Sequence, residues 1–130
     1  MQSSPQTFKQ CETYWCEPDP TDTIGAEQQG DTIWLIVSLR SRYKVVVAVP
    51  LSRHIEKATV PFLVTVPASE ITTVDGTAPV DRVALVDQIR TLDKSRLRKK
   101  SGEISKIAFR SVLAGIDYML GKVSPQPNSN

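Results

Sequence analysis

Polar and basic side chains that directly follow an apolar run are the residues in this sequence best placed to do chemistry. The stretch DQIRTLDKSRLRKK, residues 87–100, comes immediately after Val83–Val86. Such a strand end either leads into a solvated turn or presents cations to an anionic partner. His54 is the only histidine, and an imidazole titrates near neutral pH without any perturbation. The basic stretch therefore indicates anion binding, with a solvated turn as the alternative.

The charges are distributed unevenly along the chain, although the net charge is only +2. Residues 1–31 contain one base, Lys9, and six acids, whereas residues 90–110 contain eight bases and two acids. This polarity can steer an anion toward one side of the molecule. A solvated face is the commoner explanation for a run of charges, and it remains open here.

The two cysteines do not form a recognisable metal or disulfide pattern. Cys11 and Cys16 have four residues between them, no nearby histidine and no second cysteine pair, which is poor zinc spacing. On one strand, the odd gap would place them on opposite faces and prevent a disulfide. We therefore expect two free thiols and no metal site.

Length and composition predict one soluble globular domain. The chain has 130 residues, of which 40% are hydrophobic and 23% charged. No apolar window approaches the ~18 residues that a membrane span needs. The first residues have no basic segment followed by an apolar one, so we expect no secretion signal and a cytoplasmic protein.

The secondary-structure elements that would position these polar and basic residues are mostly short strands. Apolar, β-branched runs without a helical period predict strands at Thr13–Cys16, Ile33–Val37, Val45–Val49, Phe62–Val66 and Val80–Val86. The uninterrupted run 45–49 predicts a central strand, which Pro50 should end by removing a backbone donor. We expect Thr91–Lys100 to form a solvated loop and helix.

One segment has a helical apolar period. Its stripe comprises Ile104, Ile107, Ala108, Val112, Ile116, Met119 and Leu120. Ser105 is the expected N-cap, and Gly121 is placed as a C′ glycine. We expect residues 1–8 to be loose, residues 9–121 to form the domain, and the polar, proline-containing tail 122–130 to be disordered.

Several motifs occur in the order found in the MazF/PemK toxins, and together they span roughly residues 9–121. The strongest is the strand ending in Asp87-Gln88-Ile89-Arg90, followed by Thr91-Leu92-Asp93, which resembles the family's (D/E)-Q-(I/V)-R and (T/S)-(I/L)-D. The other matching stretches are Thr13-Tyr14-Trp15, Gly25-Ala26-Glu27-Gln28, Leu35-Ile36-Val37-Ser38, Pro50-Leu51-Ser52, Pro61-Phe62, Ile104-Ser105 and Leu120-Gly121.

The resemblance implies a CcdB/MazF-like fold that is mainly β with helices. This is an SH3-like β-barrel, formed by a twisted antiparallel sheet, with a C-terminal helix. It also implies a homodimer, a cognate antitoxin as partner, and cleavage of single-stranded mRNA at short sequences without metal or cofactor. In that reaction the ribose 2′-hydroxyl attacks the adjacent phosphorus and leaves a cyclic phosphate and a free 5′-hydroxyl.

This sequence departs from the family at the positions where a phosphate-binding arginine is usual. Thr32 replaces the arginine of G-x-R-P, and Leu85 stands where some members have a second arginine. Cys11 and Glu12 replace the glycine and aspartate of the first-strand motif. Loss of one charge stabiliser in such sites costs about 2.7–4 kcal/mol of activation free energy.

The site residues follow from this alignment and from the cations near it. We expect the catalytic residues to be Ser52, Arg53, His54 and Asp87, and the RNA-binding residues to be Glu27, Thr32, Arg40, Arg42, Gln88 and Arg90. Arg53 or Arg40 would supply the phosphate charge, and His54 would take or give a proton. Alternatively, these cations are solvated loop residues, Glu27 holds a turn, and Asp87 caps a strand end.

Two functions are compatible with these observations. One is an active endoribonuclease toxin, and the other is a catalytically weakened relative that keeps antitoxin or RNA binding. Thr32 in place of arginine is the feature that separates them. The aromatic residues Trp15, Trp34, Phe62 and Phe109 are mainly core candidates, although one of them could stack on a base.

Overall fold

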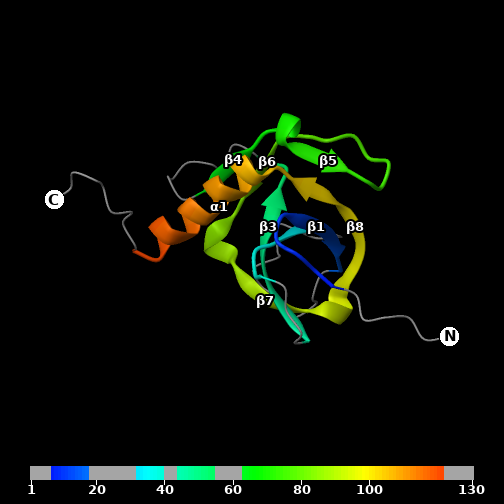
Figure 1. The fold of residues 1–130 in the computed structure, drawn as a ribbon, viewed down its shortest axis with the longest axis horizontal. Helices are drawn as coiled ribbons and strands as arrows, with labels where there is room; N and C mark the ends of the chain where they lie inside the picture. The colour runs from blue at the N-terminus through cyan, green and yellow to red at the C-terminus, as the bar shows by residue number, and fades with distance from the viewer. Residues whose placement is uncertain (1–6, 18–31, 40–43, 55–62, 122–130) are drawn as a thin grey trace.

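Eight strands and one α-helix make up the described part of the chain, which comprises residues 7–17, 32–39, 44–54 and 63–121 of a computed structural model (Figure 1). The strands form one antiparallel sheet in the order β4-β6-β3-β2-β1-β8-β5, with β7 also paired to β3. The sheet curves into a barrel-like shape with a C-terminal helix, which confirms the predicted fold class. The bounds are β1 Glu12–Cys16, β2 Thr32–Ile36, β3 Val45–Ser52, β4 Val64–Val66, β5 Ile71–Thr73, β6 Arg82–Ala84, β7 Arg90–Asp93, β8 Leu97–Ile104 and α1 Lys106–Met119.

The central strand β3 is longer than its sequence predicted. It pairs with β2 on one side, and on the other side with β7 along Val45–Ala48 and then with β6 at Leu51 and Ser52. Pro50 does not end the strand, contrary to the prediction. Its missing N–H falls where the pairing passes from β7 to β6, and its carbonyl accepts a hydrogen bond from the Leu85 N–H at 3.0 Å.

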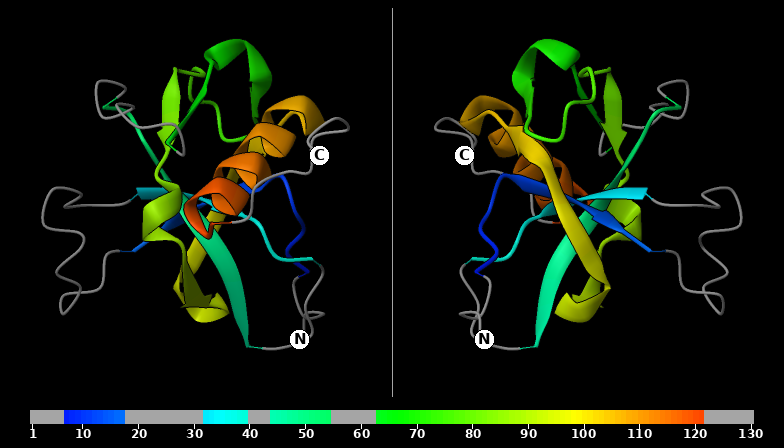
Figure 2. Two further views of the ribbon diagram at one scale, coloured as in Figure 1. Left: turned by 90° about the vertical axis from the view of Figure 1, so that its left-hand side faces the viewer. Right: turned by 90° about the vertical axis from the view of Figure 1, so that its right-hand side faces the viewer.

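Alternation of side chains along the strands produces two apolar clusters. Ile33 and Leu51 belong to the cluster beneath α1, together with Phe109 and Val112 of the helix. Tyr14, Trp34 and Ala48 belong to the second cluster, on the other face of the strands. Figure 2 shows α1 on one side of the barrel and β8 crossing the opposite side.

The N-terminal segment that the sequence predicted to be loose contains a buried anchor. Phe8 is only 3% exposed, and its ring meets that of Tyr14 edge-on with centroids 4.7 Å apart. Residues 1–6 and the tail 122–130 lie outside the described residues.

The basic stretch is largely a strand, which corrects the prediction of a solvated loop and helix. β7 covers Arg90–Asp93, a single 3₁₀ turn follows, and β8 runs through Leu97–Ile104. β8 pairs with β1, so the basic and acidic parts of the sequence become neighbours. Lys100 contacts Glu12 at 3.2 Å and Glu103 at 3.3 Å, and Arg98 pairs with Glu17. Part of the positive charge is therefore neutralised within the fold.

Strand β5 was missed by the sequence reading, because ITT is too short to show a period. It pairs with the end of β8, at Thr73↔Gly102. A Cβ at position 102 would overlap the backbone carbonyl of Thr72, so only glycine allows this close approach. The loop after β5 is thereby held against the barrel.

Helix α1 confirms most of the predicted stripe. The Ser105 Oγ accepts a hydrogen bond from the Ala108 N–H at 3.0 Å, as an N-cap does, and Gly121 has a φ of +86°. Ala108 and Val112 are buried, but Ile107 is 70% exposed and Ile104 belongs to β8. The buried face of α1 comprises Ala108, Phe109, Val112 and Gly115, and Leu120 of the predicted stripe is 71% exposed.

Candidate active site

Ser52 is the last residue of β3, and its side chain is buried. The residue is 5% exposed, and its hydroxyl oxygen accepts a hydrogen bond from the His54 N–H at 3.0 Å. Arg53 and His54 follow directly and are both exposed. This local turn brings together three of the four predicted catalytic residues, at the end of a central strand.

Thr32 lies beside this group on the neighbouring strand. Ile33 pairs with Leu51, so Thr32, the first residue of β2, is next to Ser52 across the antiparallel ladder. Paired residues point to the same face, and the Thr32 side chain is half-buried. The fold thus places the family's arginine position against its serine position, and in this chain threonine occupies the first of these.

Arg82 is a cation at this end of the sheet that the sequence reading missed. Its Nη1 donates to the Leu51 carbonyl at 3.3 Å, and Ser52 pairs with Val83, the next residue of β6. Burial lowers the pKa of the half-buried Arg82, as does the nearby charge of Arg53, whereas Asp75 acts in the opposite direction. The sequence signal that could have revealed this cation is the position of Arg82 inside the predicted strand Val80–Val86.

The family signature after β6 forms a separate group. Asp87 is exposed, in the 3₁₀ turn Val86–Gln88, and Arg90 begins β7 opposite Ala48. Ala48 precedes Ser52 by four residues on β3, a strand distance of about 13 Å. Within the described part of the chain, the buried Oε1 of Gln88 has no hydrogen-bond partner. The predicted site residues therefore fall into two groups along β3.

The other sites that sequence reasoning proposed have mixed outcomes. Leu85, the family's second arginine position, is 2% exposed and belongs to the core. Glu27, Arg40 and Arg42 lie outside the described residues. No disulfide joins Cys11 and Cys16 within the described residues.

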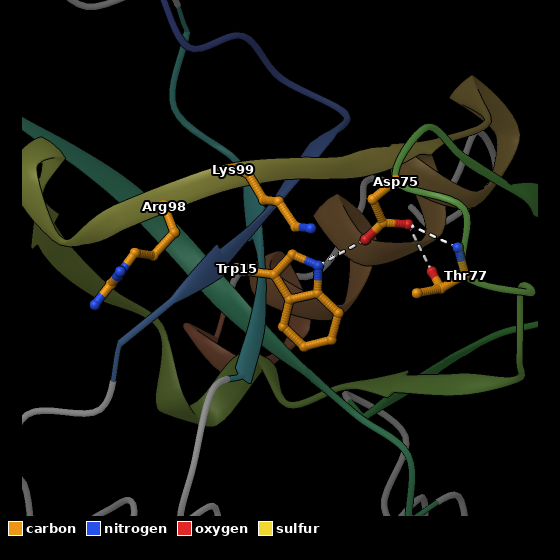
Figure 3. Close-up of a pocket in the computed structure, with 5 residues that line it drawn as sticks. All are labelled: Trp15, Asp75, Thr77, Arg98 and Lys99. Atoms are coloured by element: carbon orange, nitrogen blue, oxygen red, sulfur yellow. Dashed lines mark hydrogen bonds between the residues drawn. The ribbon is translucent and has the colours of Figure 1, made fainter.

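A pocket lies beside β1 and β8 and is lined by residues of both strands and of the loop after β5 (Figure 3). The Trp15 Nε1 donates to Asp75 Oδ2 at 2.7 Å, while the backbone N–H and Oγ1 of Thr77 donate to Asp75 Oδ1 at 3.1 and 2.6 Å. These bonds lower the pKa of Asp75 to about 2, with the Thr77 hydroxyl as the largest cause. Arg98 and Lys99 complete the lining of a cavity of about 610 Å³.

Of the aromatic residues that sequence reasoning considered, only Trp15 lines this pocket. Trp34 and Phe109 are 7% and 5% exposed and belong to the two apolar clusters. Phe62 lies outside the described residues. The prediction that one aromatic residue could face a ligand thus has a single candidate in the described structure.

No group of three or more histidine, cysteine, aspartate or glutamate side chains that could hold a metal ion occurs among the described residues. Across that part of the chain, no helix is both long and apolar enough to cross a bilayer.

Solved structures define the fold class of this barrel. MazF (form I) from Deinococcus radiodurans is 24% identical, with a TM-score of 0.65 over 90% of this chain and 99% of that chain. An endoribonuclease in complex with its cognate antitoxin, from a mycobacterial species, is 23% identical, with a TM-score of 0.61 over 90% and 96%. The MazE–MazF complex (form II) from D. radiodurans is 21% identical, with a TM-score of 0.64 over 92% and 100%.

Residues 9–120 match the family described as PemK-like, MazF-like toxins of type II toxin–antitoxin systems. The chain belongs to this family, which confirms the resemblance drawn from its motifs. No curated protein sequence matches the chain.

Proposed function

We propose that this chain is the toxin of a type II toxin–antitoxin system and cleaves single-stranded mRNA in the cytoplasm without a metal ion. The main support is the position of Ser52, which lies beside Thr32 and is followed by Arg53 and His54, in a chain of the toxin family. Two structurally similar proteins from mycobacterial species are an endoribonuclease and an endoribonuclease in complex with its cognate antitoxin.

The reaction needs one proton removed, one supplied, and charge stabilised on phosphorus. The ribose 2′-hydroxyl loses its proton to a base and attacks the adjacent phosphorus, while the bond to the 5′-oxygen breaks and that oxygen gains a proton. His54 is our candidate for proton transfer, because imidazole serves either role near neutral pH. The products are a cyclic phosphate and a free 5′-hydroxyl.

Arg53 and Arg82 are the candidates for the missing phosphate charge. A guanidinium matches phosphate geometry and stays protonated at neutral pH, even when it is partly buried. The two positive charges repel each other, and a phosphate bound between them would relieve this repulsion. Ser52 would orient the reacting phosphate through its hydroxyl group.

The RNA surface would extend from this end of the sheet toward Gln88 and Arg90. Gln88 contributes a buried oxygen that a base N–H could satisfy. Asp87 is exposed in the same turn and remains a candidate acid or base. We also propose a homodimer and an acidic cognate antitoxin that covers the basic surface.

The second candidate function is a binding module that has lost cleavage. This alternative is favoured because uncharged residues, Thr32 and Leu85, occupy both positions where the family usually has an arginine. A module of this kind would retain the antitoxin or RNA surface. It would arrest growth without producing new RNA ends, or give no phenotype.

Expression of the chain alone, followed by mapping of RNA ends, tests the proposal. Free 5′-hydroxyl ends at one recurrent short sequence are expected. Ser52→Ala, Arg53→Ala, Arg82→Ala, His54→Ala and Arg40→Ala should be compared, with Arg110→Ala on α1 as a control. Loss of a phosphate-binding cation should slow cleavage about 100- to 1000-fold. Equal rates for wild type and all five variants would refute the assignment.

A further inference from the structure

The Trp15 pocket has the size and chemistry of a ligand site but no role in the reaction described above. Its volume of about 610 Å³ lies within the roughly 300–1,000 Å³ typical of small-molecule sites. Trp15 is half-buried, whereas Arg98 and Lys99 are exposed. Figure 3 shows the indole between the basic side chains of β8 and the Asp75–Thr77 loop.

The pocket adjoins the Ser52 end of the sheet. Trp15 pairs with Ile33, which pairs with Leu51, the residue before Ser52. Two strand spacings separate the backbones of Trp15 and Leu51, about 10 Å. The charge of Asp75 also acts on Arg82, which is close to Arg53. Trp15 packs against the cluster that contains Leu51, and Leu51 and Arg82 line the same face, whereas the Ser52 side chain points to the other face. An RNA chain bound at Arg53 and Arg82 could therefore continue into the pocket.

Each wall of the pocket offers a different interaction. The indole provides a flat π surface, and Lys99 provides a positive charge at the rim. Asp75 Oδ2 accepts the Trp15 N–H within the described part of the chain, and a carboxylate oxygen has a second lone pair for another donor. Arg98 is engaged with Glu17 in an exposed pair, which contributes little stability and can exchange for a phosphate.

We propose that this pocket binds an unpaired RNA base flanking the cleaved phosphate, with the base stacked on Trp15 and its amino group on Asp75. The sugar–phosphate chain then runs along Lys99 and Arg98. This inference rests on the proposed function, because it assigns a subsite to the same RNA.

The carboxylate determines which bases fit. Cytosine and adenine carry an exocyclic amino donor, and guanine carries N–H donors on its Watson–Crick edge, whereas uracil presents two carbonyls and one N–H. The pocket should therefore prefer cytosine, adenine or guanine to uracil. An RNA base fits beside Asp75 better than a carboxylate of an acidic antitoxin segment, because a base can donate a hydrogen bond to the Asp75 carboxylate and a carboxylate cannot.

Binding of short 2′-O-methyl oligonucleotides tests this subsite without cleavage, because the attacking hydroxyl is blocked. Eight-nucleotide oligo(C), oligo(A) and oligo(U) are titrated into the wild-type chain and followed by anisotropy. Oligo(C) and oligo(A) should bind about tenfold tighter than oligo(U). Trp15→Ala should weaken oligo(C) binding by roughly 5- to 150-fold, and Trp15→Phe much less.

Substitution of Asp75 gives an internal control of base preference. Asp75→Asn keeps a similar shape but replaces one acceptor with a donor, so the preference for oligo(C) over oligo(U) should disappear or reverse. Arg110→Ala, an exposed cation on α1, should leave binding unchanged.

Parallel cleavage assays with unmodified RNA separate the two proposals. If wild type cleaves RNA but Trp15→Ala binds and cleaves equally well, the subsite is wrong and the nuclease assignment stands. If wild type cleaves nothing but oligo(C) binding still depends on Trp15, the nuclease assignment fails and the pocket stands as a base-binding site of an RNA-binding protein. An acidic peptide that binds through Trp15, where RNA does not, would overturn the subsite.

Discussion

Trp15 and Asp75 are 60 residues apart in the sequence, and a hydrogen bond of 2.7 Å joins the indole nitrogen of one to the carboxylate of the other. The bond links β1, which belongs to the barrel, with the loop that follows β5. Pairing of β5 to β8 holds that loop in place. The pocket therefore depends on a peripheral strand, and its integrity can be tested separately from the stability of the barrel.

Asp75 should make the stability of this protein depend on pH in the acidic range. Its pKa is lowered from 3.8 to about 2, so folding favours the charged form. The stabilisation is present above pH ~4 and is lost as the pH falls through ~2. Wild type should therefore lose stability relative to Asp75→Asn on acidification, as measured by urea unfolding at several pH values. Thr77→Val, which removes the hydroxyl bond, should give an intermediate profile; parallel curves for wild type and Asp75→Asn would contradict the assignment.

Gly102→Ala should detach β5 from β8, because the new methyl group would occupy the place of the Thr72 carbonyl. Hydrogen exchange should show faster exchange along β5 and in the loop bearing Asp75, while β2 and β3 stay protected. Thr72→Ala is a suitable control, since the exposed Thr72 side chain is not what touches Gly102. Protection of β5 equal to that of wild type would show that the backbone can relax.

Cys11 has a φ of +77°, where the family's first-strand motif has glycine. An L-residue in this region carries about 1–2 kcal/mol of strain that glycine avoids. Cys11→Gly should therefore be more stable than Cys11→Ala by about 1 kcal/mol in chemical denaturation. Both variants lack the thiol, so the comparison isolates the backbone. A more stable alanine variant would mean that position 11 can leave the left-handed region at little cost.

Phe109 anchors α1 to the barrel, and it is 5% exposed within the cluster that contains Leu51. Phe109→Ala should lower the free energy of unfolding by about 3–5 kcal/mol through lost burial and a cavity. Leu113→Ala, on the 36% exposed side of the same helix, should change it by less than about 1 kcal/mol. Thermal unfolding of both variants checks the prediction, and similar losses would indicate that the outer face of α1 is also covered.

Local patterns in the sequence were sufficient for much of the scaffold. The β-branched runs located β1, β2 and the centre of β3, and the capping residues Ser105 and Gly121 bounded α1 correctly. These features depend on neighbours within a few residues, so a linear pattern contains them. Strands β5 and β8 were missed because their residues are polar or few, and pairing with β1 rather than hydrophobicity makes them strands.

The sequence by itself determined the family, the antiparallel sheet and the terminal helix. Only the tertiary structure decided that Thr32 lies beside Ser52, that Arg82 reaches the Leu51 carbonyl, and that Trp15 both packs against the core and lines a pocket. The physical reason is that these relationships join distant segments through strand register and side-chain direction. A one-residue change of register would move each of these side chains to the other face of the sheet.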